Sequence, residues 1–398
     1  MTLASGAFLT LRTGGFQFTH LFPSIRSVFS KSEDGGKGMT AFQAVATALG
    51  GSVGTANIAG VAGAIVIGGP GAVFWMWVSA VFGMAVKCCE TLLAVKYGGG
   101  AMVCIERGLG KRFRPLAYAF SVFGMLASLL GTALVQSNTV ALSALDAARS
   151  LGLRSGGSSV LLSAGVFTAV LTAIVIFGGA KRIGGFSERA VPFMALLYAS
   201  ACAAVIIANR SRLIPALESI FLSAFGIKPA IGCVCGSGFK KALSVGVARG
   251  VYSNEAGVGS SPLAHAKASD GDPVMHGMLG IFEVFADTGV ICTLTALAVL
   301  TSVETVPFGE SGVSGAALVG EAFSGVFGNS ARVFLSVSVL LFAFTSLVGW
   351  SLYGECCAVY LFGPGSAAVF RAVYALLIPV GAIASTDTVW RQIGRAHV

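Results

Sequence analysis

Charged side chains are scarce in this chain of 398 residues, where Asp, Glu, Lys and Arg together make up only 11%. Soluble domains carry about 25% charged residues, so an ordinary soluble domain is excluded. Hydrophobic residues make up 55% and gather in runs long enough to cross a bilayer, which takes about 20 apolar residues. The composition therefore predicts an all-α polytopic membrane protein with little mass outside the lipid bilayer.

Common enzyme motifs are also lacking. Neither a Walker-type G-x-x-x-x-G-K-[ST] nor an H-E-x-x-H occurs, and the histidines have no metal-ligand spacing to cysteine or carboxylate. The nine cysteines are scattered, which predicts no disulfide framework. Lysine and arginine lie mostly in short loops rather than in a basic stripe, so nucleic acid is not expected as a partner despite the net charge of +9. We expect no enzymatic activity and no organic cofactor.

The stretch from Met39 to Gly71 is apolar enough to span the membrane, but its middle is a poor helix. Gly50, Gly51 and Gly54 each cost a helix about 1 kcal/mol relative to alanine, and hydrocarbon cannot satisfy the backbone groups that a broken helix frees. Such a break is tolerated only where it is buried in protein or lines a polar cavity. We expect it to form half of a binding site; a glycine seam packed against a neighbouring helix is the alternative.

A second stretch, residues 238–265, is also polar and glycine-rich for a span. It carries the motif Asn-x-Ala-Gly-Val at 254–258, which the first stretch carries at 57–61. Five spans begin before the second copy, and an odd number of spans inverts its topology. Paired broken spans in an inverted repeat mark the central site of a transporter; chance similarity in a chain rich in Gly, Ala and Val is the alternative.

The basic loops set the expected orientation. Placing loops 21–38, 97–114, 179–189 and 263–274 inside leaves the acidic loop 303–330 outside, as the positive-inside rule requires. A basic cluster on the outer side opposes this orientation, and it consists of Arg210, Arg212, Lys228, Lys240 and Lys241.

Three long motifs cover both unusual stretches and one later span: GSVGTANIAGVAGAIVIGGPGAVFWMWVSAVFGMAVKCCETLLAVKYG at 51–98, RGVYSNEAGVGSSPLAHA at 249–266 and FAFTSLVGWSLYGECC at 342–357. In these motifs the chain resembles the sodium:alanine (alanine or glycine:cation) symporter family, and the resemblance continues in order over nearly the whole chain. It implies the leucine-transporter-like fold, a 5+5 inverted repeat of helices with an extra N-terminal span.

The same resemblance implies the function. We expect a monomeric multi-pass protein of the bacterial inner membrane that imports alanine or glycine together with a sodium ion by alternating access. The helices that carry residues 39–97 and 238–302 would rock against the rest. Proton coupling is the alternative within this fold, while a channel, which needs a continuous polar path, and a membrane-embedded enzyme are the competing classes.

The resemblance also divides the chain. Residues 1–20 are expected to be part of the extra span, 39–208 the first five-helix repeat, and 238–392 the second repeat, all within one transport domain. The second repeat is expected to be truncated, because the family continues past Trp390 into a final span that is absent here. Residues 393–398 read as a translated sequencing adapter, so a non-native tail is expected.

The expected substrate is a zwitterion, which needs hydrogen-bond donors for its carboxylate and acceptors for its ammonium group. Half-helix N-termini and unwound carbonyls supply both. We predict substrate contacts at Gly54, Thr55, Ala56, Asn57, Gln136, Tyr252, Ser253, Asn254, Ser346 and Trp350. Two of these depart from the family pattern, which has glycine at position 56 and phenylalanine at position 252. Interhelical hydrogen bonds are the alternative role for the polar residues, and packing is the alternative for the aromatic rings.

The resemblance further implies a sodium site formed by the carbonyls of Gly50 and Val53 and the hydroxyls of Thr345 and Ser346. Hard oxygen ligands suit a hard cation. Hydroxyls that bond back to their own helix are the alternative.

Ionisable residues inside spans are costly unless they are paired or hydrated. Lys87 and Glu90 lie three positions apart on one helix face and are expected to pair. Glu283 and Asp287 lie four positions apart and share a face, so they repel each other unless a cation or a proton is near. Neutralisation by Lys87 and a role in ion coupling are both open for this pair.

Overall fold

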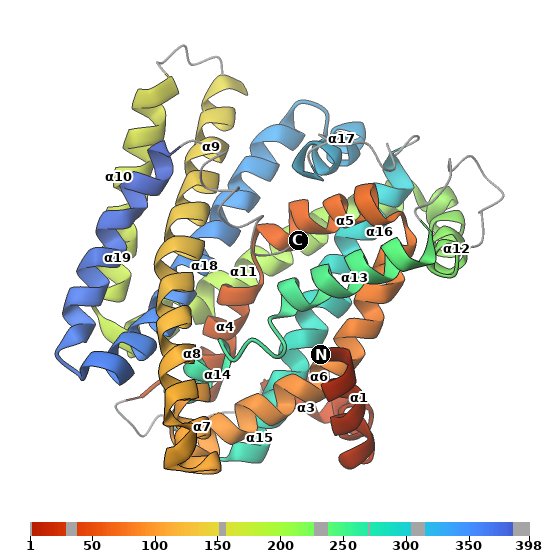
Figure 1. The fold of residues 1–398 in the computed structure, drawn as a ribbon. Helices are drawn as coiled ribbons and strands as arrows, with labels where there is room; N and C mark the ends of the chain where they lie inside the picture. The colour runs from red at the N-terminus through yellow and green to blue at the C-terminus, as the bar shows by residue number, and fades with distance from the viewer. Residues whose placement is uncertain are drawn as a thin grey trace.

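The structure is a computed structural model that describes residues 2–28, 38–150, 157–226, 238–269, 271–303 and 315–384. In these ranges the chain is helical, and in place of strands it has one isolated bridge between Met39 and Ala268. Seven of the described helices are long and apolar enough to cross a membrane. They are α6 (Gly71–Tyr97), the run Lys111–Arg149, α10 (Gly157–Ile176), α11 (Gly179–Ala208), the run Pro273–Ser302, α18 (Ser330–Phe362) and α19 (Ser366–Ile383) (Figure 1). The predicted all-α polytopic class is confirmed.

The first unusual stretch is a broken helix, as predicted. α4 (Ala41–Ser52) begins with a capping box, in which Thr40 accepts from the Gln43 N–H and Gln43 accepts from the Thr40 N–H. The helix ends before Val53, whose backbone is extended, and the chain resumes as η1 (Ala56–Gly60) and α5 (Val61–Gly68). The two halves are bent by 54°.

The second unusual stretch is also broken. α13 (Phe239–Asn254) ends at Glu255, which has a left-handed backbone with φ 55°. Gly257 and Gly259 follow with φ values of 86° and 79°, a region that glycine enters without strain. The chain becomes helical again only at α14 (Pro262–His265). The two copies of Asn-x-Ala-Gly-Val therefore both lie at interruptions.

Three spans contain a π-helical segment. These segments are η1 in the first broken helix, η3 (Ala127–Ala133) between α8 (Arg114–Leu126) and α9 (Leu134–Ser150), and η5 (Phe285–Cys292) between α15 (Pro273–Val284) and α16 (Thr293–Ser302). π-helical turns are rare and often occur at functional sites.

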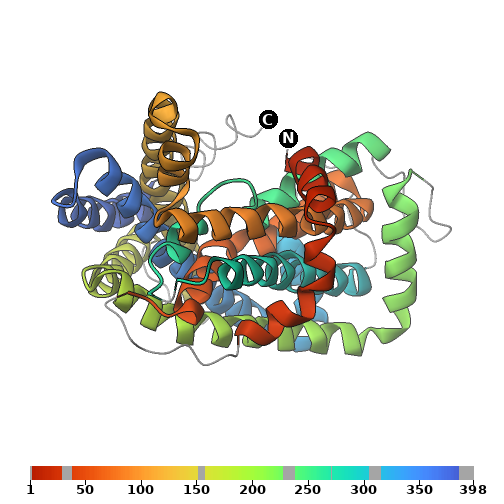
Figure 2. The ribbon, with the colours of Figure 1, turned by 90° about the horizontal axis from the view of Figure 1, so that it is seen from below.

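The helices form two closely packed groups. α9, α10 and α19 stand together on one side of the molecule in both ribbon views and pack against α18 (Figures 1 and 2). α6 packs along α13 and α15. The approach of α13 to α6 needs glycine, because a Cβ on Gly246 would lie 2.3 Å from the carbonyl oxygen of Ala72.

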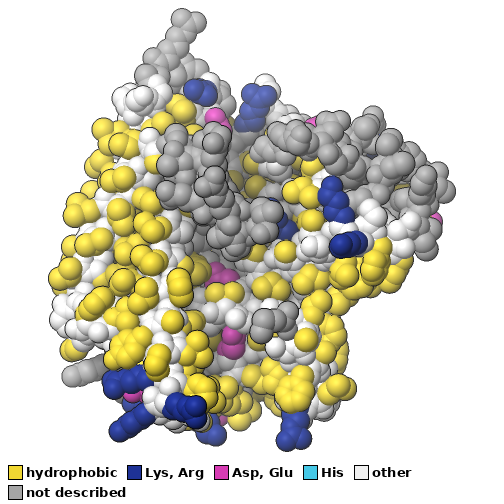
Figure 3. All heavy atoms as spheres, in the orientation of Figure 1, with side chains coloured by type: hydrophobic (Ala, Val, Ile, Leu, Met, Phe, Trp, Pro, Cys, Tyr) yellow, Lys and Arg dark blue, Asp and Glu magenta, His cyan; other side chains and the backbone are white. Residues whose placement is uncertain are grey.

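The remaining described helices are short and lie at the edges. They are α1 (Thr2–Arg12), α2 (Phe16–Thr19), α3 (Leu21–Val28), α7 (Ala101–Leu109), η2 (Lys111–Phe113), η4 (Arg210–Arg212), α12 (Leu213–Ala224) and α17 (Gly315–Phe327). Figure 3 shows hydrophobic side chains over the middle of the molecule and lysine and arginine near its lower and upper ends, as expected for a protein embedded in lipid.

One expected loop is wrong. Residues 179–189 form the first turns of α11 rather than a connection. Gly179, with φ 72°, completes the turn after α10 by itself, so the next helix begins at once and carries Lys181 and Arg182 in its first turns. The expected C-terminal tail, residues 393–398, lies outside the described residues.

Candidate functional site

Asn57 holds the first break in shape. Its side-chain oxygen accepts a hydrogen bond from the Gly54 N–H at 2.9 Å, and the residue is fully buried. A broken helix leaves backbone donors without partners at membrane depth, and this amide satisfies one of them. The predicted site residue therefore already has a structural role.

The same amide joins the two broken segments. Asn57 Nδ2 donates to Asp287 Oδ1 at 2.6 Å and to Ser253 Oγ at 3.1 Å. Ser253 Oγ in turn donates to Asp287 Oδ2 at 2.6 Å. Asn57, Ser253 and Asp287 come from the first break, α13 and η5, so three interrupted elements meet at one buried carboxylate. The sequence placed Asp287 among the intramembrane ions but not among the site residues.

Asn254 repeats the arrangement at the second break. Its side-chain oxygen accepts from the Ala256 N–H at 3.0 Å, and its Nδ2 donates to Thr288 Oγ1 of η5 at 3.1 Å. Each asparagine thus caps its own break and reaches η5. The asparagine of the repeated Asn-x-Ala-Gly-Val motif therefore makes the same kinds of hydrogen bond at both breaks.

Two polar side chains, Ser346 and Gln136, lie next to the first break. An ideal Cβ on Gly54 would lie 2.8 Å from Ser346 Oγ and 3.8 Å from Gln136 Nε2, so these predicted residues lie together. Ser346 Oγ and Gln136 Oε1 are buried and have no hydrogen-bond partner among the described residues. Buried polar atoms nearly always have a partner in folded proteins. A polar ligand at this point would supply one.

Two of the expected sodium ligands, Gly50 and Thr345, lie close together. A Cβ on Gly50 would lie 3.6 Å from both the Cβ and the carbonyl oxygen of Thr345. The Thr345 hydroxyl donates to carbonyls of its own helix, to Phe342 at 3.0 Å and Leu341 at 3.1 Å, which is the alternative role expected for it; its oxygen can still accept a cation. Val53 is buried at the end of α4, where the last carbonyls of a helix lack intrahelical partners. The donor set therefore consists of oxygens, as a hard cation needs.

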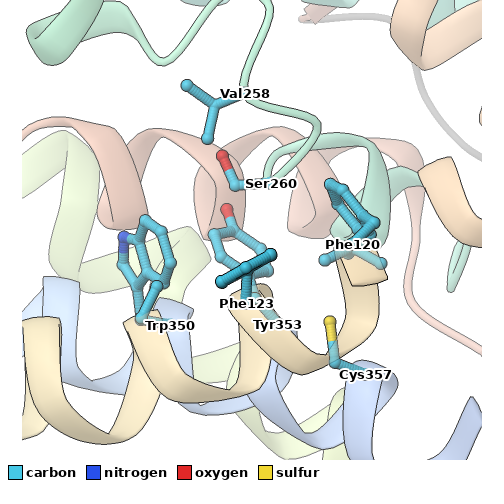
Figure 4. A pocket seen from close by; sticks show the side chains of 10 residues that line it. Phe120, Phe123, Val258, Ser260, Trp350, Tyr353 and Cys357 are labelled. Atoms are coloured by element: carbon cyan, nitrogen blue, oxygen red, sulfur yellow. The ribbon is translucent and has the colours of Figure 1, made fainter. Parts of the chain in front are cut away.

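Trp350 lies beside the second break. Its Nε1 donates to Glu255 Oε1 at 3.1 Å, and its ring packs edge-on against Tyr353 at 5.4 Å between centroids. Both rings line a cavity of about 220 Å³ between α8, α18 and residues 258–263, where they point toward Val258 and Ser260 (Figure 4). Its volume is small, which suits a small ligand.

The remaining predicted contacts are placed less centrally. Tyr252 is 46% exposed on α13 and does not line this cavity. Thr55 and Ala56 are half-buried where η1 begins.

Sequence reasoning missed Tyr353. Its hydroxyl is buried without a hydrogen-bond partner among the described residues, and a Cβ on Gly51 would lie 2.8 Å from it. It therefore bridges the first break and the cavity. The available signal was its position three residues after Trp350, which puts both rings on one helix face.

The buried ions form a single cluster. Lys87 is 1% exposed, and its Nζ has no hydrogen-bond partner among the described residues. It attracts Glu90, Glu255, Glu283 and Asp287 electrostatically. The expected close Lys87–Glu90 pair is not among the ion pairs of the described residues, and Glu90 instead accepts from the Gly257 N–H at 3.2 Å. Lys87 is thus a shared countercharge.

This architecture defines a class of protein. An all-helical membrane protein with two broken helices that meet at a central polar network has the leucine-transporter-like fold of secondary transporters. The solved structure of MhsT in complex with L-phenylalanine matches it with a TM-score of 0.63 and 13% sequence identity, over 87% of this chain and 81% of that one.

The chain belongs to the sodium:alanine symporter family, whose sequence profile matches residues 1–394. The sodium/alanine symporter AgcS of Methanococcus maripaludis is 38% identical, over 98% of this chain and 86% of that protein. The probable sodium/glutamine symporter GlnT of Bacillus subtilis is 35% identical, over 98% of this chain and 80% of that protein. The protein is therefore a multi-pass membrane transporter, an amino acid symporter rather than an enzyme.

Proposed function

We propose that this protein imports a small neutral amino acid, alanine or glycine, together with sodium. The observation that carries the proposal is the first break, where Gly54 faces the Ser346 hydroxyl, which has no hydrogen-bond partner among the described residues, and Nε2 of the Gln136 amide. A zwitterion bound there would meet the polar atoms of both side chains and the backbone of the break. The names of AgcS and GlnT support an amino acid and sodium as cargo.

Sodium is assigned to the group of Gly50, Val53, Thr345 and Ser346. Ser346 would contact both cargoes, which gives a physical basis for coupling because each would help to order the hydroxyl for the other. The packing of α6 with α13 and α15 supports a moving group that carries residues 39–97 and 238–302. Residues 39–208 and 238–392 would be the two repeats.

The direct test uses the full chain in proteoliposomes with labelled alanine and glycine. An inward sodium gradient is expected to drive saturable accumulation, and collapsing that gradient should abolish it. A proton gradient alone should have little effect. Accumulation driven by protons without sodium would establish the alternative coupling, and non-saturable uptake would favour a channel.

A matched pair of glycine substitutions tests the position of the site. Gly54→Ala puts a methyl group 2.8 Å from Ser346 Oγ, whereas Gly63→Ala on the same broken helix meets nothing within 4 Å. We expect Gly54→Ala to reduce alanine uptake at least tenfold at normal protein levels, while Gly63→Ala retains most of it. Equal uptake by the two variants would contradict the placement of the substrate site at this break.

A further inference from the structure

A buried chain of hydrogen bonds lies beyond the second break and outside the proposed substrate and sodium sites. His265 of α14 faces His276 and Glu283 of α15, and each of these side chains is at most 2% exposed. His265 Nε2 lies 2.5 Å from Glu283 Oε1, and the two Nδ1 atoms of His265 and His276 lie 2.7 Å apart. Ser261 Oγ donates to Glu283 Oε2 at 2.6 Å.

Hydrogen-bond rules limit where the protons can be. A carboxylate only accepts, so His265 Nε2–H donates to Glu283. Of the two facing Nδ1 atoms, one must donate and the other must accept. Either His276 donates to a neutral His265, or His265 carries both ring protons and donates to His276. With His276 neutral in both, the second arrangement holds one more proton than the first, with the same positions of all heavy atoms.

Carboxylates predominate among the charged groups around the two rings. Glu283 feels the repulsion of Glu90 from α6 and the attraction of Lys87. Carboxylates outnumber the single buried ammonium group in this cluster, and an opposite charge nearby stabilises a cation. The other titratable groups on the elements packed around the chain are Cys88, Cys89, Lys96 and Tyr97 of α6, Glu255 of the second break, Lys267 and Asp272 between α14 and α15, Asp287 and Cys292 of η5, Arg332, Tyr353, Glu355, Cys356, Cys357 and Tyr360 of α18, and the exposed Arg26 of α3. The described part of α4 carries no titratable side chain.

We propose that His265, together with Glu283 and His276, is a proton-binding site, and that the bound proton fastens α14 to α15. The bound proton turns the hydrogen bond between a neutral ring and the Glu283 carboxylate into an ion pair, in which both partners are charged. α14 is only 4 residues long and directly follows the irregular segment, so this bond fixes the end of the second broken helix. An effect of this proton on transport rests on the proposed function, because it requires α14 to move during alternating access. The existence of the proton-binding site does not depend on the proposed function.

The proton site can be tested without any substrate. The chain has only four histidines, so imidazole nitrogen NMR of the full chain in nanodiscs can follow each ring, with His265→Gln and His276→Gln for assignment. Free histidine side chains change charge between about pH 5 and 8. We expect one shared titration step that both buried rings report and that is lost from His276 in His265→Gln. Rings that titrate independently, or neither ring titrating in this range, would overturn the proposal.

The transport effect is tested by sodium-driven alanine uptake between about pH 5 and 8. The wild type is expected to slow severalfold toward low pH, and His265→Gln should lose this dependence. His20→Gln is the matched control, because His20 lies in the N-terminal segment, where it stacks on Phe16. This variant should keep the wild-type pH profile. If His265→Gln does not fold, His276→Gln should shift the midpoint by about half a pH unit or more. If His265→Gln and His276→Gln both keep the wild-type pH profile of uptake, the coupling to α14 is refuted, even where the NMR titration shows that the proton-binding site exists.

Discussion

Asn57 shows how one side chain can be structural and functional at once. Its two N–H groups donate to Ser253 and Asp287 and its oxygen accepts from the Gly54 N–H, so it can donate to a ligand only by giving up one of these bonds. The cost of leaving a buried polar group unpaired is about 1–3 kcal/mol. Asn57 therefore controls the shape of the break that presents Gly54 to Ser346, whether or not it touches the substrate.

Asn57→Ala tests this control. The substitution leaves the Gly54 N–H and one oxygen of Asp287 without partners, so we expect alanine uptake to fall below about a tenth of wild type. A loss of about 1–3 kcal/mol in stability for each unpaired group would show as a lower melting temperature.

Asn209→Ala is the matched control. Asn209 also makes two side-chain hydrogen bonds, to Val205 and Ser302, but at the end of α11. This variant should keep uptake within about twofold of wild type. Normal transport by Asn57→Ala would contradict the claim that the shape of the break, as held by Asn57, is needed for uptake.

Trp350 is expected to limit substrate size. Trp350→Ala enlarges the cavity beside the second break and should admit larger neutral amino acids, such as leucine, as competitors of alanine uptake. Trp350→Phe keeps a ring but loses the hydrogen bond to Glu255, so it should keep the selectivity for small substrates. An unchanged substrate profile in Trp350→Ala would contradict this role.

At the scale of the helices, the contact between α6 and α13 joins two members of the proposed moving group. Gly246→Ala would place its methyl group 2.3 Å from the Ala72 carbonyl oxygen, and backbone atoms must shift to admit it. Overpacking of this kind typically costs about 1–3 kcal/mol. We expect a melting temperature several degrees below wild type, measured on the purified protein by circular dichroism.

The control is Gly185→Ala on α11, where an added methyl group meets nothing within 4 Å. Alanine is the better helix former by about 1 kcal/mol, so this variant should melt at or above the wild-type temperature. Equal destabilisation by both substitutions would mean that the α6–α13 contact is not the cause.

The sequence was most informative about these elements. Glycine clusters at Gly50–Gly54 and Gly257–Gly259 predicted both interruptions, because glycine is a poor helix former and, at Gly257 and Gly259, enters a backbone region that few other residues tolerate. Their contacts could not be predicted in the same way. Asp287 accepts from residues more than thirty positions away in sequence, and His265 meets His276 only because the chain turns between α14 and α15. Spacing rules follow one helix at a time and miss groups that tertiary packing brings together.

At the scale of the whole molecule, sodium should stabilise the folded transporter. A ligand that binds only the native state adds about 2.7 kcal/mol at one hundred times its Kd. We expect sodium to raise the melting temperature relative to potassium at equal ionic strength, and Ser346→Ala to abolish this difference. The same shift in potassium, or in Ser346→Ala, would exclude the assigned sodium site.

The three π-helical segments carry a consequence for movement. η1 and η5 meet at the Asn57–Asp287 bond, and η3 precedes the segment of α9 that bears Gln136. A π turn holds an extra residue, so returning it to α geometry changes the register of the adjoining helix by about one position, a rise of about 1.5 Å and a rotation of about 100°. Side chains beyond such a segment can thus exchange places in the site while both ends of the span stay anchored in the bilayer.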